Sequence, residues 1–352
     1  MDDAQPRSLL RAPMHRRGFL GAALGGAAAL AGGGLLAGCG SSSSAGGSPV
    51  AIQLIYILNS QFAGSIMAEE KGFFRAAGLD VTLVPGAPNA VPELAVHSGK
   101  ALVGITHPSK AVKAIANGAD LKIIGADYQK NPFCIVSNAE KAIRTPRDLA
   151  GRKIGVPDIN IPLFQAFLTA NQVPLGSVQI VKAEFDPRPV VSGEFDGFMG
   201  FYGDEPVILE VMGIPNYALR FSDFNYPSLA ELYIVKNSTL ADPLARKEVA
   251  GVLKAEIQGW QVALADPDEA GRVTVARYGK QFKLDPVVAI REARKQRELV
   301  ADEDTAAHGL LWMTDQKIAG TCRSLSLGGL PARPDMFSNE VLEELYRGKT
   351  TL

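Results

Sequence analysis

Cysteine, tryptophan and histidine are scarce in this sequence, and neither sign of charge dominates it. The 352 residues include three cysteines, two tryptophans and four histidines, and the formal net charge is −1. No two cysteines form a CxxC pair and the histidines lack metal-ligand spacing, so we expect no metal site and no cofactor. A chain with almost no net charge has no electrostatic reason to bind nucleic acid, so we expect no partner of that class.

The first 38 residues have the pattern of an export signal. Arginines precede an uncharged run of alanine, glycine and leucine over residues 18–38, which ends in small residues before Cys39. A basic start, an apolar stretch and small residues at a cleavage point predict a signal peptide over residues 1–38. A transmembrane anchor is the alternative, but glycine and alanine dilute the run and no basic flank follows it. The serine- and glycine-rich residues 39–49 predict a flexible tether.

Two cysteines remain beyond the predicted tether, Cys134 and Cys322. A disulfide between them is permitted in an oxidising compartment. Two buried free thiols are the other possibility, because a buried cysteine behaves as a small hydrophobic residue. The sequence leaves both possibilities open.

Short strands alternate with helices twice along the chain. A second block of strands and helices covers residues 139–231, and from residue 242 the chain is mostly helical. This alternation is typical of parallel or mixed sheets that helices cover on both faces. In the first block we expect strands over residues 50–58, 79–85, 100–106 and 120–128, and helices over residues 62–78, 90–99 and 108–118.

The two blocks predict an α/β fold of two lobes. We assign residues 50–138 and 232–352 to the first lobe and residues 139–231 to the second. The chain then crosses twice between the lobes, near residues 132–138 and 231–237, and a double crossing forms a hinge that closes on a ligand. Ligands of open α/β sheets bind beyond the carboxyl ends of the strands, so we expect the functional residues in that cleft.

Three segments carry the pattern of a known family. Residues 58–86 hold an apolar strand end, a Gln-Phe-Ala-Gly turn and the pattern KGFF…GLDV. Residues 185–206 lead from a strand through an aromatic residue to the turn GDEP, and residues 221–228 form the proline-containing turn FSDFNYPS. Together they resemble the periplasmic substrate-binding proteins grouped as SsuA/THI5-like. Residues 36–39, LAGC, resemble a lipobox, and residues 15–21 resemble the twin-arginine pattern.

The resemblance implies an extracytoplasmic receptor, lipid-anchored through Cys39, that delivers a small ligand to the permease of an ABC importer. It implies a two-lobed periplasmic-binding-protein fold of type II-like form, and we expect a monomer without enzymatic activity. Members with this pattern bind heteroaromatic vitamin precursors such as the thiamine pyrimidine or riboflavin, whereas more distant members bind alkanesulfonates, taurine or nitrate. Eukaryotic members that make the thiamine pyrimidine carry a cysteine-rich motif, which this sequence lacks. A sensor subunit with the same fold remains an alternative function. The export route is also left open between the twin-arginine and the general route.

Two adjacent carboxylates, Asp204 and Glu205, follow a predicted strand over residues 195–201. As a catalytic pair they would diverge, and as a metal site they lack partners at a fitting spacing. Asp204 is a good helix N-cap and Pro206 a favoured first-turn residue, so capping alone is one possibility. The other is that Asp204 or Glu205 accepts hydrogen bonds from the ligand. Asp204 stands where members of the family usually carry asparagine.

Aromatic and polar residues at the predicted strand ends complete the candidate ligand site. Rings on such loops stack on a planar ligand, although a single aromatic residue is more often part of a core. Polar side chains there form hydrogen bonds to a ligand, or else belong to turns and helix caps. The aromatic candidates are Phe62, Tyr202, Phe224 and Tyr226, and the polar ones are Asn59, Gln61, Thr106, His107, Ser109, Asp158 and Asn160.

Overall fold

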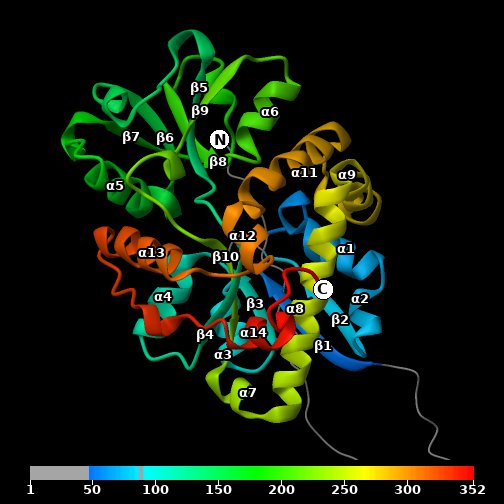
Figure 1. Ribbon diagram of the computed structural model, residues 1–352. Coiled ribbons are helices and arrows are strands. Elements are labelled where there is room, and N and C mark those ends of the chain that lie inside the picture. Colours follow the sequence, from blue (N-terminus) through cyan, green and yellow to red (C-terminus); the bar gives the residue numbers. More distant parts are fainter. Residues whose placement is uncertain (1–46, 87–89) are drawn as a thin grey trace, which may run out of the picture. The chain divides into compact units, whose positions relative to one another are not determined.

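Ten strands form two five-stranded sheets within residues 47–86 and 90–352, the part of the chain that this computed structural model describes (Figure 1). The predicted export signal (residues 1–38), the lipidation site Cys39 and most of the predicted tether lie outside this part. The first strand begins at Ser48, two residues earlier than predicted. The described residues belong to one compact unit.

The first sheet has the strand order β2–β1–β3–β10–β4. Strand β1 is parallel to β2 and β3, whereas β10 is antiparallel to β3 and β4. Its aliphatic side chains fill a separate hydrophobic core on each face, because helices cover both sides. The strands are Ser48–Leu54 (β1), Leu79–Val84 (β2), Val103–Thr106 (β3), Lys122–Tyr128 (β4) and Ala230–Val235 (β10).

The second sheet has the strand order β7–β6–β8–β5–β9. Strand β6 is parallel to β7 and β8, whereas β5 is antiparallel to β8 and β9. It too carries a hydrophobic core on each face, a larger one against α5 and a smaller one against α6. The strands are Phe133–Asn138 (β5), Lys153–Pro157 (β6), Gln179–Ala183 (β7), Gly197–Phe201 (β8) and Asn216–Arg220 (β9).

Several helices begin with the same capping chemistry. Asp242 and Asp285 stand just before α8 and α11, and each side chain accepts hydrogen bonds from two backbone N–H groups of the first turn. A proline follows each aspartate, at the position where a missing N–H costs least. None of the described helices is both long and apolar enough to span a membrane. The helices are Ala63–Glu70 (α1), Phe73–Ala76 (α2), Pro92–His97 (α3), Pro108–Ala116 (α4), Ile161–Ala170 (α5), Glu205–Val211 (α6), Asn237–Ala241 (α7), Pro243–Ala265 (α8), Pro267–Thr274 (α9), Lys280–Phe282 (α10), Pro286–Val300 (α11), Glu303–His308 (α12), Asp315–Leu327 (α13) and Glu340–Tyr346 (α14).

The predicted two-lobed α/β fold is confirmed. The chain passes from the first sheet to the second between β4 and β5 and returns between β9 and β10, which is the expected double crossing. One boundary differs, because β5 pairs with β8 and β9 and so places residues 133–138 in the second sheet instead of the first lobe. Its continuous apolar run fits a buried strand of either sheet, so the pattern does not reveal its partners.

The helix predicted over residues 62–78 consists of two helices, α1 and α2. Between them Gly72 has a φ of 74°, the left-handed conformation that ends a helix and that glycine adopts at little cost. Both helices contribute to the same hydrophobic core, so the apolar spacing continues across the break. Periodicity alone therefore predicts a single helix there.

The two described cysteines are free thiols. Cys134 lies in β5 and Cys322 in α13, and both are buried. Burial raises the pKa of each thiol, which lowers its reactivity. Of the two possibilities that the sequence leaves open, the structure shows the buried thiols.

Two glycines allow helices α1 and α8 to approach closely. A Cβ atom on Gly259 would overlap the carbonyl oxygen of Gly64 and stand 2.8 Å from the backbone nitrogen of Ala68. A Cβ atom on Gly64 would overlap the indole ring of Trp260, which is fully buried. The packing of α8 against α1 therefore depends on the absence of side chains at these two positions.

A buried hydrogen-bond network ties α8 to the first sheet. The carboxyl group of Asp127 accepts hydrogen bonds from Trp260 Nε1 at 2.6 Å and from the Tyr233 hydroxyl at 2.8 Å. The carboxyl group of Glu256 accepts one from the Ser65 hydroxyl at 2.9 Å and lies 3.1 Å from the Tyr233 hydroxyl. Burial raises the pKa of Asp127 well above its usual value and that of Glu256 to about 7. The Tyr233 hydroxyl has one hydrogen for two carboxyl groups, so ionising both is costly.

Candidate functional site

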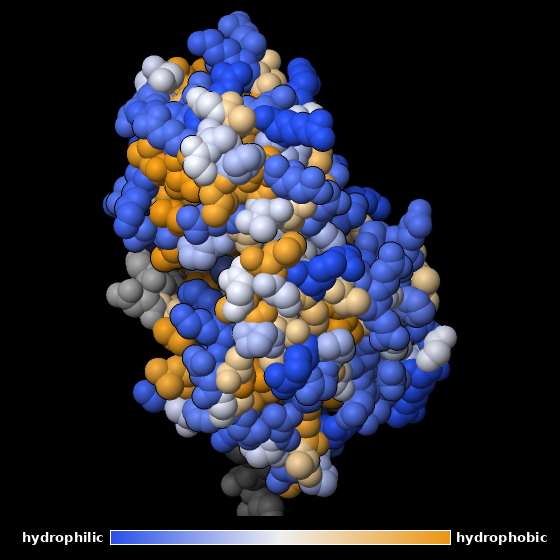
Figure 2. Space-filling view, turned by 90° about the vertical axis from the view of Figure 1, so that its left-hand side faces the viewer, coloured by the Kyte–Doolittle hydropathy of each residue, from blue (hydrophilic) through white to orange (hydrophobic). Residues whose placement is uncertain are grey.

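A cavity of about 250 Å³ lies between the two lobes, beside both crossings of the chain. The face that carries α4, α5 and α13 is hollowed between the lobes (Figure 2). Strands β3 and β6 lead at their carboxyl ends into segments that line the cavity, which is where ligands of α/β sheets bind. The lining residues are His107, Pro108, Ser109, Lys110, Lys113, Asn131, Pro132, Phe133, Ile159, Asn160, Pro162, Leu163, Tyr226, Ser228, Ala230, Ser324, Leu325, Gly328 and Leu330.

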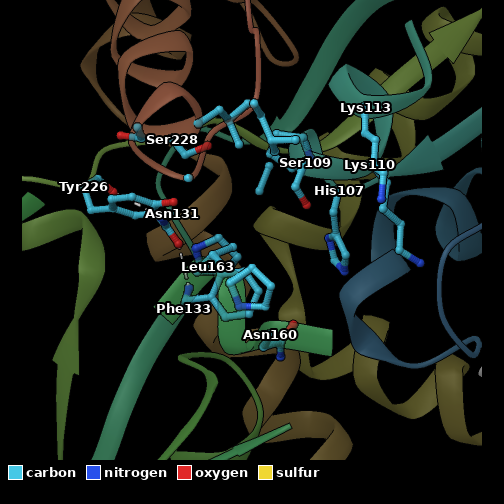
Figure 3. A pocket seen from close by; sticks show the side chains of 18 of the residues that line it. His107, Ser109, Lys110, Lys113, Asn131, Phe133, Asn160, Leu163, Tyr226 and Ser228 are labelled. Carbon is cyan, nitrogen blue, oxygen red and sulfur yellow. Dashed lines mark hydrogen bonds between the residues drawn. The ribbon is translucent and has the colours of Figure 1, made fainter. Parts of the chain in front are cut away.

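Figure 3 labels side chains from four segments around the cavity: the start of α4, the first crossing, the second crossing and the start of α5. These residues belong to both lobes and to the two crossings between them, so a ligand in the cavity would lie against both lobes and the hinge. In the order of the segments, the labelled residues are His107, Ser109, Lys110 and Lys113, then Asn131 and Phe133, then Tyr226 and Ser228, and finally Asn160 and Leu163.

Asn131 connects the two crossings of the chain. Its Oδ1 accepts a hydrogen bond from the backbone nitrogen of Phe133 at 3.0 Å, and its Nδ2 donates one to the carbonyl oxygen of Tyr226 at 3.1 Å. Ser324 of α13 donates to the carbonyl oxygen of Pro227 at 2.5 Å. These hydrogen bonds hold the hinge wall of the cavity in place, since each one ends on the backbone of a crossing segment.

His107 occupies the N-cap position of α4, directly after β3, and its side chain makes no capping hydrogen bond. Its Nδ1 lies 3.2 Å from Oε1 of Glu231. The imidazole meets Phe201 edge-on with ring centroids 5.6 Å apart, and Phe201 meets Phe133 edge-on at 4.7 Å. These three rings stand between the cavity and a second, much smaller recess that Phe201 lines.

The recess has a volume of about 10 Å³, room for one water-sized group. Asn59, Gln61, Asp204 and Glu292 are among its lining residues. Burial raises the pKa of Asp204 and of Glu292, and the two carboxyl groups are hydrogen-bonded to each other. The Nε2 of Gln61 is buried without a hydrogen-bond partner among the described residues. No cluster of side chains within residues 47–86 and 90–352 is arranged to hold a metal ion.

The carboxyl group of Glu205 turns back on its own strand. Its Oε2 accepts a hydrogen bond from the backbone nitrogen of Phe201 at 2.6 Å. Burial, and then the charge of Asp204, raise the pKa of Glu205 well above its usual value. Asp204 stands at the N-cap position of α6, but its side chain makes no capping hydrogen bond. The side chain of Asp204 therefore does not act as a helix cap, and one carboxyl oxygen of Glu205 is hydrogen-bonded to the backbone at the end of β8.

Seven candidates from the sequence line one of the two hollows. Their backbone positions at strand ends are those expected from the sequence, and the fold brings them together from both lobes. That they contact a ligand stays a prediction. They are His107, Ser109, Asn160 and Tyr226 in the cavity, and Asn59, Gln61 and Asp204 in the recess.

Four other candidates are engaged elsewhere. Phe62 is part of the first-lobe core, and Phe224 packs on the core of the second sheet. Thr106 donates a hydrogen bond to a buried glutamate of α3. Asp158 is exposed and lies 2.8 Å from the ammonium group of a lysine in β7. A position at a strand end determines at which edge of the sheet the residue lies. The direction of its side chain depends on neighbouring residues that the sequence pattern does not show.

Tyr202 lines neither hollow. Its ring faces the guanidinium group of Arg220, 5.0 Å from the ring centroid, and the ammonium group of Lys295 at 4.8 Å. Its hydroxyl donates a hydrogen bond to Glu298 at 2.9 Å. Lys295 and Glu298 belong to α11, whereas Tyr202 and Arg220 belong to the second lobe, so this cluster holds α11 on that lobe. A ligand contact for Tyr202 stays a prediction.

Replacing Tyr202 with leucine is expected to weaken the contact between α11 and the second lobe. Two cation–π contacts and two hydrogen bonds, one to Glu298 and one from Lys295, are lost, so the free energy of unfolding should fall by about 1–2 kcal/mol. Urea unfolding measures the change. Tyr217→Leu is the matched control, since it removes one cation–π contact with Arg144 within the second lobe. A loss no larger than that of the control would contradict the role of the cluster.

Three groups of cavity residues were not among the sequence-based candidates. Lys110 and Lys113 follow the predicted His107 and Ser109 in the first turns of α4, so helical spacing is a signal that points to them. Asn131 and Phe133 lie beside the predicted first crossing, and the turn NPF marks the place. The residues of α13 are far away in the sequence, and no local pattern connects them to the cleft.

Comparison with known proteins decides the family. The sequence matches the family described as NMT1/THI5 like over residues 59–270, which is more than half of the chain. The chain belongs to this family. In this NMT1/THI5-like chain the matched residues include α4, α5 and both crossings. The match ends before α11, which lines the recess, and before α13, which lines the cavity.

Relatives of this NMT1/THI5-like chain carry several functional names. It is 25% identical over 321 residues to the riboflavin-binding protein RibY of Chloroflexus aurantiacus, a match that covers 83% of this chain and 85% of RibY. It is 23% identical over 231 residues to a Haemophilus influenzae protein named for thiamine biosynthesis, over 64% of this chain and 73% of that protein. The crystal structure of the periplasmic aliphatic sulphonate binding protein SsuA from Escherichia coli has a TM-score of 0.65 at 15% identity, over 83% of this chain and 92% of SsuA. This last similarity shows the shared fold.

Proposed function

We propose that this NMT1/THI5-like chain is an extracytoplasmic solute-binding protein that delivers a small heteroaromatic ligand to an ABC importer. The observation that carries the proposal is the cavity beside the hinge, which both lobes line with rings and hydrogen-bonding groups. Closure of two lobes around a hinge buries most of a small ligand, as binding pockets generally do. The permease subunits of the importer are the proposed partners, and the chain is proposed to act as a monomer.

The cavity fits a ligand of one or a few fused rings. Its volume of about 250 Å³ lies just below the usual range for small-molecule pockets, about 300–1,000 Å³. Phe133, Leu163 and Tyr226 offer apolar surface, and His107 and Ser109 offer polar groups. By analogy with base stacking, a planar ring gains roughly 1–3 kcal/mol from each aromatic side chain on which it stacks. This combination favours a flat heterocycle over a small aliphatic ion.

The names of the relatives support a ligand of the vitamin type. RibY is named for riboflavin and the Haemophilus influenzae relative for thiamine biosynthesis. SsuA, which shares the fold, is named for aliphatic sulphonates, so a sulfonate, taurine or nitrate is the alternative ligand class. The aromatic rings around the cavity favour the heteroaromatic class.

We also propose that the protein is located outside the cytoplasm and is anchored to the membrane by a lipid on Cys39. The support is the export pattern of residues 1–38 and the lipobox-like residues 36–39. The serine- and glycine-rich stretch that follows is suited to a flexible tether, and the body that binds the ligand begins with β1.

Catalysis is not part of the proposal. A thiamine-pyrimidine synthase-like enzyme is the weaker alternative, raised by the name of the Haemophilus influenzae relative. An enzyme of this kind requires reactive groups beside the bound substrate. Cys134 and Cys322 are buried and line neither hollow, and the paired carboxyl groups of Asp204 and Glu292 lie in the recess, beyond the ring cluster. The histidine and the two lysines that line the cavity, His107, Lys110 and Lys113, are proposed to bind the ligand.

A thermal-shift screen tests the proposal. The protein is heated with vitamins, pyrimidines, alkanesulfonates, taurine and nitrate, and a ligand at a hundred times its Kd should stabilise it by about 2.7 kcal/mol. Leu163→Trp fills the cavity and is expected to abolish the shift. Leu175→Trp is the matched control, because Leu175 is exposed, belongs to the same lobe and lines neither hollow. It should retain the full shift.

Two outcomes would change the conclusion. A shift of unchanged size in the Leu163→Trp variant would put the ligand outside the cavity and contradict the proposal. A shift with sulfonates but with none of the ring compounds would contradict the heteroaromatic ligand while leaving a solute-binding function in place.

A further inference from the structure

We propose that Glu231 positions His107 as a hydrogen-bond donor to the ligand, so that the ligand meets the cavity with an acceptor atom. The inference rests on the proposed function, in which the cavity is the ligand site, and it narrows the ligand class. It favours a ring that carries carbonyl groups over a ring that presents an amino group to His107. Glu231 is a positioning residue in this account, and His107 is the residue that touches the ligand.

Glu231 stands out among the residues of β10. Its side chain is fully buried, and neither carboxyl oxygen has a hydrogen-bond partner among the described residues. Its φ is 49°, a left-handed conformation that a residue with a side chain adopts only at a cost. Strained, buried polar residues of this kind cluster at binding sites, where the surrounding structure holds them.

The imidazole ring of His107 faces the buried carboxyl group of Glu231. The Nδ1 of His107 lies 3.2 Å from Oε1 of Glu231. A second buried carboxyl group, that of Asp127, is close enough for its charge and that of Glu231 to repel each other. An uncompensated negative charge buried at this position is costly, so the pair of Glu231 and His107 is expected to be neutral as a whole.

Both neutral forms of the pair place a hydrogen on Nε2 of His107. In one form a carboxylate faces an imidazolium ring, which carries a hydrogen on each nitrogen. In the other form a protonated Glu231 donates to Nδ1, and the neutral ring keeps its hydrogen on Nε2. Nε2 is the ring nitrogen that does not approach Glu231, and the His107 side chain lines the cavity. His107 therefore offers a donor to whatever occupies the cavity.

The other polar groups of the cavity agree with an acceptor-bearing ligand. No carboxylate occurs among the lining residues in the described part of the chain. Lys110 and Lys113 carry only donors, and the hydroxyl of Ser109 makes no side-chain hydrogen bond within residues 47–86 and 90–352. The hydroxyls of Ser228 and Ser324 already donate to backbone carbonyl oxygens. A ligand oxygen thus finds several free donors, whereas an amino group finds few acceptors.

The first test needs no ligand. Long-range proton–nitrogen NMR spectra of the ¹⁵N-labelled protein report which ring nitrogen of each histidine carries the hydrogen, and His107→Gln identifies the signals of His107. We expect a protonated Nε2 on His107. His97 is an internal reference, because its Nδ1 accepts a hydrogen bond from the backbone nitrogen of Asp120 at 3.3 Å and its hydrogen then resides on Nε2. An unprotonated Nε2 on His107 overturns the proposal.

The second test measures the Kd of three probes by calorimetry: lumichrome, whose rings carry carbonyl groups, the amino-bearing thiamine pyrimidine, and methanesulfonate. Lumichrome is expected to bind and the aminopyrimidine is not. Glu231→Met should weaken lumichrome binding about tenfold, because methionine has no group that donates to Nδ1 or accepts from it and so nothing holds the ring hydrogen on Nε2. His107→Phe is combined with Glu231→Met, so that no buried charge is left alone, and should weaken binding at least as much. Glu256→Gln removes another buried carboxyl group of the same lobe and should leave the Kd unchanged.

The outcomes separate this inference from the proposed function. Binding of methanesulfonate alone contradicts the heteroaromatic ligand, and it supports the donor role of His107 only if the Glu231 variant weakens it, because Lys110 and Lys113 also attract an anion. Binding of the aminopyrimidine alone leaves the proposed function standing and overturns the inference. Equal weakening by Glu231→Met and Glu256→Gln would reflect a general loss of buried carboxyl groups and would also overturn it. If none of the probes binds, the inference is overturned, because it expects lumichrome to bind.

Discussion

Gly259→Ala is expected to destabilise the protein strongly, although it adds only a single methyl group. The new Cβ atom would overlap the carbonyl oxygen of Gly64 and approach the backbone nitrogen of Ala68 to 2.8 Å. Because both obstacles are backbone atoms of α1, no side chain can rotate away, and α8 has to move off α1. Overpacking of this kind costs about 3 kcal/mol, the upper part of its usual range. The midpoint of urea unfolding measures the loss.

Gly176→Ala is the matched control for this prediction. A Cβ atom on Gly176 meets no atom within 4 Å, so the same change should alter the free energy of unfolding by less than about 0.5 kcal/mol. Gly64→Ala, which places its methyl group against Trp260, should be damaging as well. If Gly259→Ala unfolds at the same urea concentration as the unchanged protein, the close approach of α1 and α8 is not present in solution.

Glu256→Gln is expected to stabilise the protein at pH 8 and to have little effect at pH 4.5. Burial raises the pKa of Glu256 from 4.5 to about 7 in the folded chain. The folded state therefore holds this proton more tightly than the unfolded state, and its contribution to stability is complete below pH 4.5 and is lost as the pH rises through 7. The difference of about 2.5 pH units corresponds to about 3 kcal/mol. Glutamine stays neutral, so the variant does not lose this amount.

Urea unfolding at pH 4.5, 6, 7 and 8 measures the effect of Glu256→Gln. The gap between the variant and the unchanged protein should widen steadily with pH. Glu184→Gln, on an exposed residue of the second lobe, is the control and should give parallel curves. Asp127 contributes a pH dependence of the same sign to both proteins, because burial raises its pKa as well. Parallel curves for Glu256→Gln would mean that Glu256 is hydrated in solution.

Much of the fold follows from local sequence patterns. The runs LDVTLV and KIIGADY contain β-branched residues between turn signals, and they form β2 and β4 close to the expected bounds. Sheet membership does not follow in the same way. The apolar strand β5 lies next to a crossing, and its assignment to the second sheet depends on hydrogen bonds with β8 and β9. Those partners are distant in the sequence, so a local pattern has no means of indicating them.

The sequence predicts where the backbone of the candidate site lies much better than it predicts where the side chains point. His107 and Ser109 line the cavity because they follow β3 directly, and that position is visible in the sequence. Tyr202 also follows a strand, but Arg220 and Lys295 draw its ring to another surface. Glu231 adopts a left-handed conformation that nothing in the run AELYIVKN indicates. Its importance depends on burial next to His107, which only the folded chain creates.

The position of α11 and α13 has a consequence for the walls of the two hollows. Glu292 of α11 completes the recess and Ser324 of α13 braces the hinge wall, yet both helices lie beyond residue 270, where the family match ends. Substitutions in these two helices therefore change the walls of the two hollows while the strands of both sheets stay as they are. For laboratory evolution toward a new cargo, a library confined to these two helices is the place to begin.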